Sequence, residues 1–312
     1  MKAPAIARNR GVAGRGAWGR RAVLALPFAW LLAFFLVPFL IVATISLATP
    51  RVGIPPYVPV FDWSGGHLWP SIHADLSTFS LLFQDELYVG AYLESLKIAG
   101  ISTLLCLLIG YPMALGITRA APNRRGPLLM LVILPFWTSF LIRVYAWMGI
   151  LKDEGLLNSL LQWLGVIHHP LVILNTDIAI YIGIVYSYLP FMILPLYATL
   201  ERQDPALLEA AADLGARPWR AFLSVTLPLS LPGIVAGTLV VFIPAVGEYV
   251  IPDLLGGGET NMLGKALWDV FAMSRDWPTA SALAVAMLAA LVLPLALLSR
   301  FQSRMEPAED GK

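Results

Sequence analysis

Residues 201–228 read ERQDPALLEAAADLGARPWRAFLSVTLP. Asp204 is a good N-cap residue, and Pro205 suits the first position of a helix. The alanine-rich run up to Leu214 has a strong helix propensity, and Gly215 is placed to end that helix. We therefore expect a short helix, a glycine turn and a second short helix in this stretch.

Long apolar runs flank this stretch. Of the 312 residues, 58% are hydrophobic and 13% are charged, whereas a soluble domain has roughly 25% charged residues. About 20 consecutive helical residues cross a bilayer. Six runs are long enough: Ala22–Ala48, Val89–Thr118, Pro127–Leu151, Ile178–Leu200, Leu229–Ile251 and Thr279–Leu298. We expect an all-α bundle of six transmembrane helices, kinked but not broken at prolines that include Pro38, Pro112, Pro135, Pro190 and Pro244.

Basic residues predict the orientation of these spans. They cluster in residues 1–21, in the loops after the second and fourth spans, and after the sixth: Lys2, Arg8, Arg10, Arg15, Arg20, Arg21, Arg119, Arg124, Arg125, Arg202, Arg217, Arg220, Arg300 and Arg304. The positive-inside rule then places both termini in the cytoplasm. The predicted order is a basic tail (1–21), the first span (22–48), an outer loop (49–88), a transmembrane region (89–300) containing the loop 201–228, and a cytoplasmic tail (301–312). A cleaved signal peptide is disfavoured because the first apolar run is too long.

Several function classes lack support in the sequence. A net charge of +1 gives no reason to expect a nucleic-acid partner. The chain has no GxSxG, HExxH or Walker-type GxxxxGK[ST] motif, so we expect neither an intramembrane enzyme nor ATP hydrolysis on this chain. The pairs His168–His169 and His67–His73 lack the spacing of a zinc helix, so we expect no metal and no cofactor. Cys106 is the single cysteine and allows no internal disulfide.

The loop 201–228 resembles the EAA motif of permeases of ATP-binding cassette (ABC) importers. The matching positions are Glu209, Ala210, Ala211, Gly215, Val225, Leu227 and Pro228. The family commonly has isoleucine where this chain has Val225, which keeps an apolar branched side chain. Two further segments, 138–158 and 242–278, resemble the first permease subunit of spermidine and putrescine importers, the putrescine type most closely.

The resemblance implies a fold of the type I ABC importer permease and a set of partners. The partners would be two copies of a cytoplasmic ATPase, a second permease subunit, an extracytoplasmic solute-binding protein and membrane lipid. The loop would be a coupling helix, with Glu209–Gly215 in a cleft of the ATPase, and the chain would carry a polyamine across the inner membrane. Three alternatives stay open: a loop helix that rests on lipid, a permease for another cationic or organic solute, and a channel, which would need no ATPase.

Two ionisable residues lie deep in predicted spans. Arg143 is about 16 residues into the third span and Glu248 about 19 into the fifth, which in straight helices corresponds to roughly 24 and 28 Å. Charges at such depths pair, snorkel or face water. We expect either an Arg143–Glu248 ion pair or an acidic outer vestibule of Glu248 and Asp253 that attracts a cationic solute.

Overall fold

The computed structural model describes residues 15–62, 71–258 and 260–305, and it describes the side chains of residues 23–61, 73–258 and 260–292. The chain forms two compact units, Leu81–Met273 and the unit from the two chain ends, Met1–Ser80 with Ser274–Lys312. The basic side chains of both tails and His67 lie outside the described side chains.

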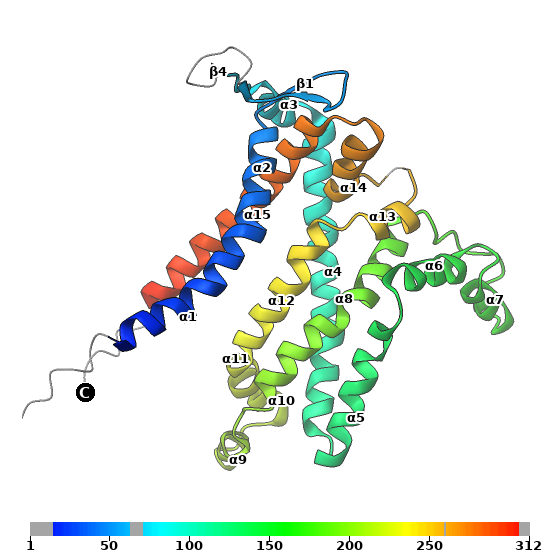
Figure 1. The fold of residues 1–312 in the computed structure, drawn as a ribbon. Coiled ribbons are helices and arrows are strands. Elements are labelled where there is room, and N and C mark those ends of the chain that lie inside the picture. Colours follow the sequence, from blue (N-terminus) through cyan, green and yellow to red (C-terminus); the bar gives the residue numbers. More distant parts are fainter. Residues whose placement is uncertain (1–14, 63–70, 259, 306–312) are drawn as a thin grey trace, which may run out of the picture. The chain divides into compact units, whose positions relative to one another are not determined.

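The unit from the chain ends is built on two long helical segments. Its helices are α1 (Arg15–Leu31), a π-helical turn η1 (Leu32–Leu36), α2 (Val37–Ile45) and α15 (Trp277–Met305). Pro38 is the second residue of α2, and the π-helical turn η1 precedes that helix; the segment Val23–Ile45 is one continuous apolar helix. Helix α15 packs along α2 (Figure 1).

The predicted outer loop contains short strands in this unit. Strand β1 (Thr49–Pro50) pairs antiparallel with β2 (Tyr57–Val58), and β3 (Phe61–Asp62) pairs with β4 (Ser71–Ile72). The ring of Tyr57 lies 6.2 Å from that of Trp277 at the start of α15. Each strand has only two residues, so helices determine the fold class.

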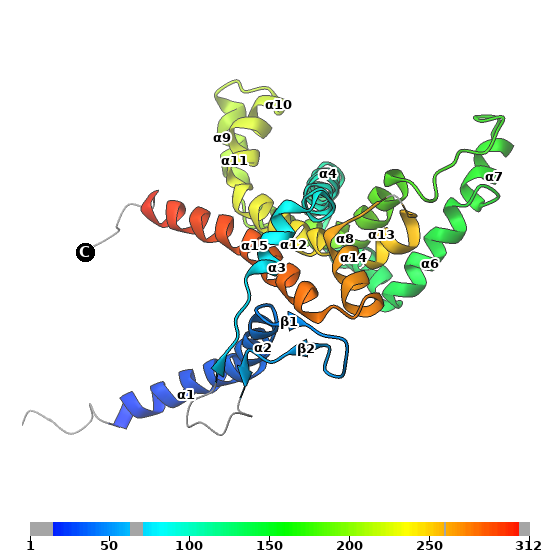
Figure 2. The same ribbon diagram turned by 90° about the horizontal axis from the view of Figure 1, so that it is seen from above.

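The second unit is a helical bundle (Figures 1 and 2). Its core is formed by α4, α8 and α12, which pack on one another. Helix α3 (Ser77–Gln84) leads into it, and the remaining elements are α4 (Glu86–Arg119), α5 (Pro122–Ile133), η2 (Leu134–Trp137), α6 (Phe140–Leu151), α7 (Leu156–Trp163), α8 (Asp177–Leu200), α9 (Pro205–Asp213), α10 (Pro218–Ala221), η3 (Phe222–Thr226), α11 (Leu227–Leu229), α12 (Leu231–Val246), α13 (Val250–Leu255), α14 (Leu263–Trp268) and η4 (Asp269–Met273).

Glycines let α12 lie very close to α8. A Cβ on Gly233 would lie 2.6 Å from Thr199 Oγ1, and one on Gly237 would lie 2.7 Å from Met192 Sδ. Met192 is fully buried and belongs to a core cluster with residues of α4 and α12. The small residues therefore allow backbone approach between membrane-type helices, whose association depends on close packing.

The predicted third span, Pro127–Leu151, is wrong as a single kinked helix. Helix α5 passes into the 3₁₀ turn η2, the backbone is extended at Thr138, and α6 then leaves at 89°. Pro135 in η2 lacks an N–H group, but Leu134 before it keeps helical angles (φ −48°, ψ −42°), and the chain leaves the helix only at Thr138. A break replaces the expected kink, and the depth of roughly 24 Å estimated for Arg143 from a straight helix does not apply.

The predicted fifth span, Leu229–Ile251, is broken as well. Helices Pro218–Leu229 and Leu231–Val246 meet at 63°, and α12 ends at Gly247 before α13 begins. By contrast, Pro112 lies within the unbroken helix α4 and Pro190 within α8. In the described residues, three continuous helices are long and apolar enough to cross a bilayer, Val23–Ile45, Glu86–Arg119 and Asp177–Leu200, and the two bent pairs are candidates for further crossings.

Candidate functional site

The loop between α8 and α12 folds as its sequence predicts. The Asp204 carboxylate accepts a hydrogen bond of 2.9 Å from the backbone N–H of Ala206, which caps α9. Pro205 is the first residue of α9. Gly215 ends the turn with φ of +79°, a conformation that a Cβ opposes. Helix α10 follows after two residues, so the predicted helix–turn–helix is confirmed.

The α9 surface is open to contact. Glu209, Ala210 and Gly215 are exposed, and Ala211 is half-buried. Leu207 and Leu214 are also exposed although they are apolar. A hollow of about 470 Å³ lies beside the turn and is lined by Leu214, Gly215, Ala216, Trp219, Arg220, Leu223 and Ser224. The loop therefore presents small and apolar groups beside an arginine, a composition suited to docking.

Hydrogen bonds hold the loop to itself and to the bundle. Gln203 Nε2 donates to the carbonyl of Thr226 at 3.1 Å, which links the two ends of the loop. The hydroxyl groups of Tyr111 in α4 and Ser230 before α12 are 2.9 Å apart and buried. Leu227 is half-buried against the core cluster, whereas Pro228 is exposed. The end of the loop is thus anchored while α9 remains exposed.

An ion pair joins the start of this loop to α5. Arg125 Nη1 lies 3.6 Å from Glu201 Oε1. The same carboxylate oxygen accepts a hydrogen bond of 2.6 Å from the Tyr197 hydroxyl. The side chains of Arg125 and Glu201 are partly exposed, so the pair contributes little stability and chiefly fixes position.

Arg143 lies in the first turn of α6 and is only 8% exposed. Its guanidinium carbon is 4.7 Å from the centre of the Phe136 ring and 5.8 Å from that of Phe140. Its Nε and Nη1 atoms are buried and find no hydrogen-bond partner within the described part of the chain. The Arg143 guanidinium is therefore packed against two aromatic rings, with which it makes cation–π contacts.

Glu248 lies in the break between α12 and α13 and is also 8% exposed. Its Oε2 accepts a hydrogen bond of 2.6 Å from the Tyr188 hydroxyl. Its Oε1 accepts bonds from the backbone N–H groups of Val250 at 3.1 Å and Ile251 at 3.4 Å. The carboxylate thus caps the start of α13 and ties it to α8.

The predicted Arg143–Glu248 ion pair is not formed in this structure. Among the described side chains, ion pairs join Lys97 to Glu94 and Asp177, and Arg125 to Glu201. A series of ring contacts leads from Phe136, beneath Arg143, to Phe191 at 5.1 Å between ring centres and from Phe191 to Tyr188 at 6.2 Å. Glu248 is already bonded to Tyr188 and to backbone N–H groups. Asp253 in α13 is exposed.

Sequence reasoning did not identify Tyr188 as the partner of Glu248, or Phe136 as the ring beneath Arg143. Tyr188 is 60 residues from Glu248 in the chain, so no local spacing connects them. The only local signal is the aromatic content of the segment around Tyr186 and Tyr188, which is equally typical of helix packing. The described residues contain no group of three or more His, Cys, Asp or Glu side chains that could hold a metal ion.

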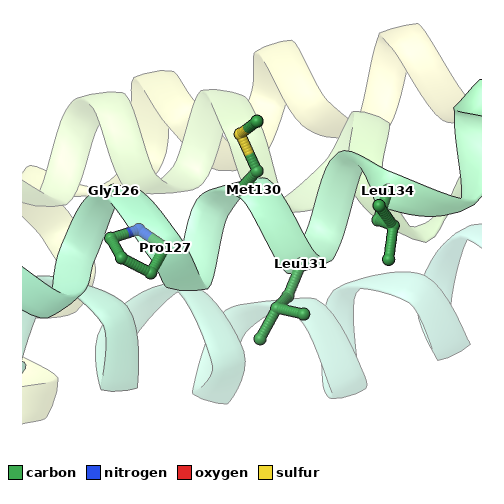
Figure 3. A pocket seen from close by; sticks show the side chains of 5 residues that line it. All are labelled: Gly126, Pro127, Met130, Leu131 and Leu134. Carbon is green, nitrogen blue, oxygen red and sulfur yellow. The ribbon is translucent and has the colours of Figure 1, made fainter.

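An apolar hollow lies along α5. It measures about 530 Å³ and is lined by Gly126, Pro127, Met130, Leu131 and Leu134. Figure 3 shows Met130 and Leu131 projecting from different sides of the helix (Figure 3). The hollow offers no charged side chain to a solute, and its lining is that of a helix surface that contacts lipid or another apolar helix.

Known proteins resemble this chain in sequence. The spermidine/putrescine transport system permease protein PotB of Haemophilus influenzae is 41% identical over 274 residues, which is 88% of this chain and 91% of that protein. PotB of Escherichia coli is 44% identical over 214 residues, 69% of this chain and 77% of that protein.

Solved structures share the fold. A bacterial ABC transporter involved in the import of the acidic polysaccharide alginate contains a chain that is 18% identical, with a TM-score of 0.68 over 94% of this chain and 98% of that one. The family described as "Binding-protein-dependent transport system inner membrane component" matches residues 21–308. Its members are transport components and not enzymes. The chain therefore belongs to the family of binding-protein-dependent transport system inner membrane components.

Proposed function

We propose that this chain is a permease subunit of an ABC importer that carries a polyamine, putrescine or spermidine, across the inner membrane. It would act with two copies of a cytoplasmic ATPase, a second permease subunit and an extracytoplasmic solute-binding protein. Similarity to PotB along most of the chain supports the substrate class. The main structural support for the transport mechanism is helix α9, which is exposed and capped by Asp204. The turn after it contains Gly215 in the left-handed backbone conformation.

In this proposal α9 couples ATP hydrolysis to transport. The exposed face around Glu209, Ala210 and Ala211 would lie in a cleft of the ATPase, because small side chains permit close approach. Leu227 and Pro228 would link the loop to the bend that leads into α12. Closure of the ATPase on ATP would move α9 as a body, and the anchored loop end would pass this movement to the bundle.

The proposed topology has six crossings with both termini in the cytoplasm. The two bent pairs count as the third and fifth crossings, and the domain boundaries remain those expected from the sequence, with a tail at 1–21, an outer loop at 49–88 and a transmembrane region at 89–300. Support comes from the arginines of the two inner loops, Arg119, Arg124, Arg125, Arg202, Arg217 and Arg220, because the positive-inside rule counts Lys and Arg and not net charge.

Glu248 and Asp253 form the proposed acidic outer vestibule. Because Glu248 is bonded to a neutral tyrosine and to backbone N–H groups, its negative charge is not cancelled by Arg143. Asp253 is exposed and adds a second negative charge. Two carboxylates at a membrane entrance raise the local concentration of a cationic solute. In this proposal Asp253 supplies the exposed charge of the vestibule, because Glu248 is only 8% exposed.

Uptake of labelled solute tests the proposal. Cells that lack this subunit, with and without the restored gene, would be supplied with labelled putrescine and spermidine. We expect ATP-dependent uptake only with the restored gene, and we expect competing unlabelled polyamine to reduce it. If uptake of both compounds is unchanged, the polyamine assignment is wrong. Restored uptake that persists without ATP would favour a channel.

A further inference from the structure

One arginine connects the ends of three helices. Arg125 lies in the first turn of α5, at the end of the bundle where α9 and α10 also lie (Figure 1). Its Nε donates a hydrogen bond of 3.0 Å to the carbonyl of Ala120, the C-cap residue of α4. Its Nη1 lies 3.6 Å from Oε1 of Glu201, the C-cap residue of α8. The Arg125 guanidinium therefore lies where α4 and α8 end and α5 begins.

Arg125 and Glu201 each lie at the unfavourable end of their own helix. A helix has a partial positive charge at its N-terminus and a partial negative charge at its C-terminus, so an arginine in the first turn of α5 and a glutamate at the end of α8 both cost free energy. The first turn of α5 has no acidic residue that offsets this cost. Across the contact the same charges are favourable, because Arg125 faces the C-terminal ends of α4 and α8. The junction, and not the helix that carries each residue, explains where the two charges lie.

Packing alone holds α5 only loosely. None of its 12 residues is buried, and Leu128, Leu129 and Val132 are partly buried against the core cluster. By contrast, α4, α8 and α12 contribute the buried residues of that cluster. Beyond α5 the chain turns by 89° into α6. The contacts of Arg125 thus add a polar connection between the core helices and a helix that buries little surface.

Glu201 also begins the loop that contains α9. Its Oε1 accepts a hydrogen bond of 2.6 Å from the hydroxyl of Tyr197, one turn earlier in α8, which orients the carboxylate. Two residues later, Gln203 Nε2 donates to the carbonyl of Thr226 at the other end of the loop. A displacement of α9 therefore reaches Glu201 along the chain, and it reaches Arg125 through the ion pair.

We propose that Arg125 is a positioning residue for transport, which transmits movement of the loop 201–228 from Glu201 to α5 and to the bend that leads into α6. This inference rests on the proposed function, in which α9 moves with an ATPase. It adds a second route to the one through α12. An exposed ion pair shifts an equilibrium by a factor of up to about five, so the effect of this route on uptake is moderate.

Charge substitutions test this route. At equal abundance in the membrane, we expect Arg125→Glu to lower polyamine uptake about fivefold. The matched control is Arg124→Glu in the same turn, which should keep uptake within twofold because Arg124 is exposed and forms no ion pair among the described side chains. Combining Arg125→Glu with Glu201→Arg restores the attraction and puts each charge at the favourable end of its own helix, so we expect at least half of the uptake to return. Equal losses in the two single variants, or no recovery in the double variant, would overturn the proposal.

Distances between two spin labels report the movement without reference to a substrate. One label would be attached at Asn123 in the first turn of α5, and the other at Arg217, which follows the α9 turn; both residues are exposed. Cys106, the native cysteine of this chain, is fully buried, so the introduced cysteines are the ones that react. In an assembled transporter whose other subunits lack cysteine, we expect ATP to leave the distance between the labels unchanged in the unsubstituted chain and in Arg124→Glu, and to change it in Arg125→Glu.

The label and uptake assays distinguish this inference from the proposed function. A distance that changes with ATP in the unsubstituted chain, or that stays the same in Arg125→Glu, would overturn the role of Arg125 even if polyamine uptake is normal. Absence of polyamine uptake by the unsubstituted transporter, together with the expected label distances, would overturn the substrate assignment alone.

Discussion

Substitution of Gly215 tests whether the backbone of the α9 turn matters for transport. With φ of +79°, Gly215 is in the left-handed region, and no heavy atom lies within 4 Å of a Cβ built there. The cost of Gly215→Ala therefore comes from backbone conformation and not from a collision, and it is about 1–2 kcal/mol. This free energy corresponds to a factor of roughly 5–30 in the population of the native turn.

The turn matters because it fixes where α9 ends. The N–H of Gly215 bonds to the carbonyl of Ala212 at 2.8 Å, and that of Ala216 bonds to Ala211 at 3.0 Å, so a turn that leaves the left-handed region loses these bonds. We expect Gly215→Ala to reduce ATP-dependent polyamine uptake about 5–30-fold, Gly215→Val to reduce it further, and Gly215→Asn to have the smallest effect, because asparagine adopts this region most readily.

The assay is uptake of labelled putrescine or spermidine, with the abundance of each variant in the membrane measured in parallel. ATPase activity of the purified transporter would show whether hydrolysis continues without transport. Native uptake by Gly215→Ala at equal abundance would refute the argument from backbone strain. An asparagine variant as impaired as the valine variant would refute it too, because the ranking follows from conformation alone.

Three further predictions concern thermal unfolding of the purified transporter. Gly233→Ala should destabilise it by about 1–3 kcal/mol through overpacking, since the new Cβ would lie 2.6 Å from Thr199 Oγ1, whereas Gly126→Ala, which meets nothing within 4 Å, should not. Tyr188→Phe removes the donor to Glu248 Oε2 and should cost about 1–3 kcal/mol; an unchanged unfolding temperature would contradict the importance of this bond. Arg143→Met removes two buried donors without acceptors and should leave stability unchanged or raise it, so a clear loss would mean that Arg143 finds a partner in the assembled transporter.

The sequence predicts the loop well because its signals are local. Asp204, Pro205 and Gly215 each determine the backbone of their own turn, and the structure has the cap, the first helical residue and the positive φ where they were expected. The first, second and fourth predicted spans are likewise continuous helices, because each is a long apolar run without a competing break.

The breaks could not be predicted because they depend on tertiary contacts. Pro112 and Pro190 lie within continuous helices, whereas Pro135 precedes a right-angle turn, although all three lie in similar apolar runs. A proline leaves one backbone carbonyl of the preceding turn without its N–H donor. The neighbouring helices decide whether that carbonyl finds another donor in a continuous helix or the chain changes direction. The sequence alone gives no information about those neighbours.

The same limit applies to the buried charges. Counting along straight helices brings Arg143 and Glu248 to similar depths and makes an ion pair one of two expectations. In the structure both spans bend. Arg143 lies over the ring of Phe136, which contacts Phe191, and Phe191 contacts Tyr188. The Tyr188–Glu248 bond joins residues 60 positions apart, a distance over which neither periodicity nor composition gives information.

The two breaks around α12 suggest how the proposed coupling would reach Glu248. Helix α12 has 16 residues and is about 24 Å long, with Ser230 at one end and Gly247 at the other. Gly233 and Gly237 leave no room between α12 and α8, so α12 can neither bend toward α8 nor turn about its axis without collision. Movement of the loop would therefore displace α12 and α8 together, and the relative change would concentrate at the breaks. Because Glu248 bonds Tyr188 of α8 and also the N–H groups of Val250 and Ile251 in α13, it holds α13 to the moving pair, so the change should concentrate at the other break, at Ser230.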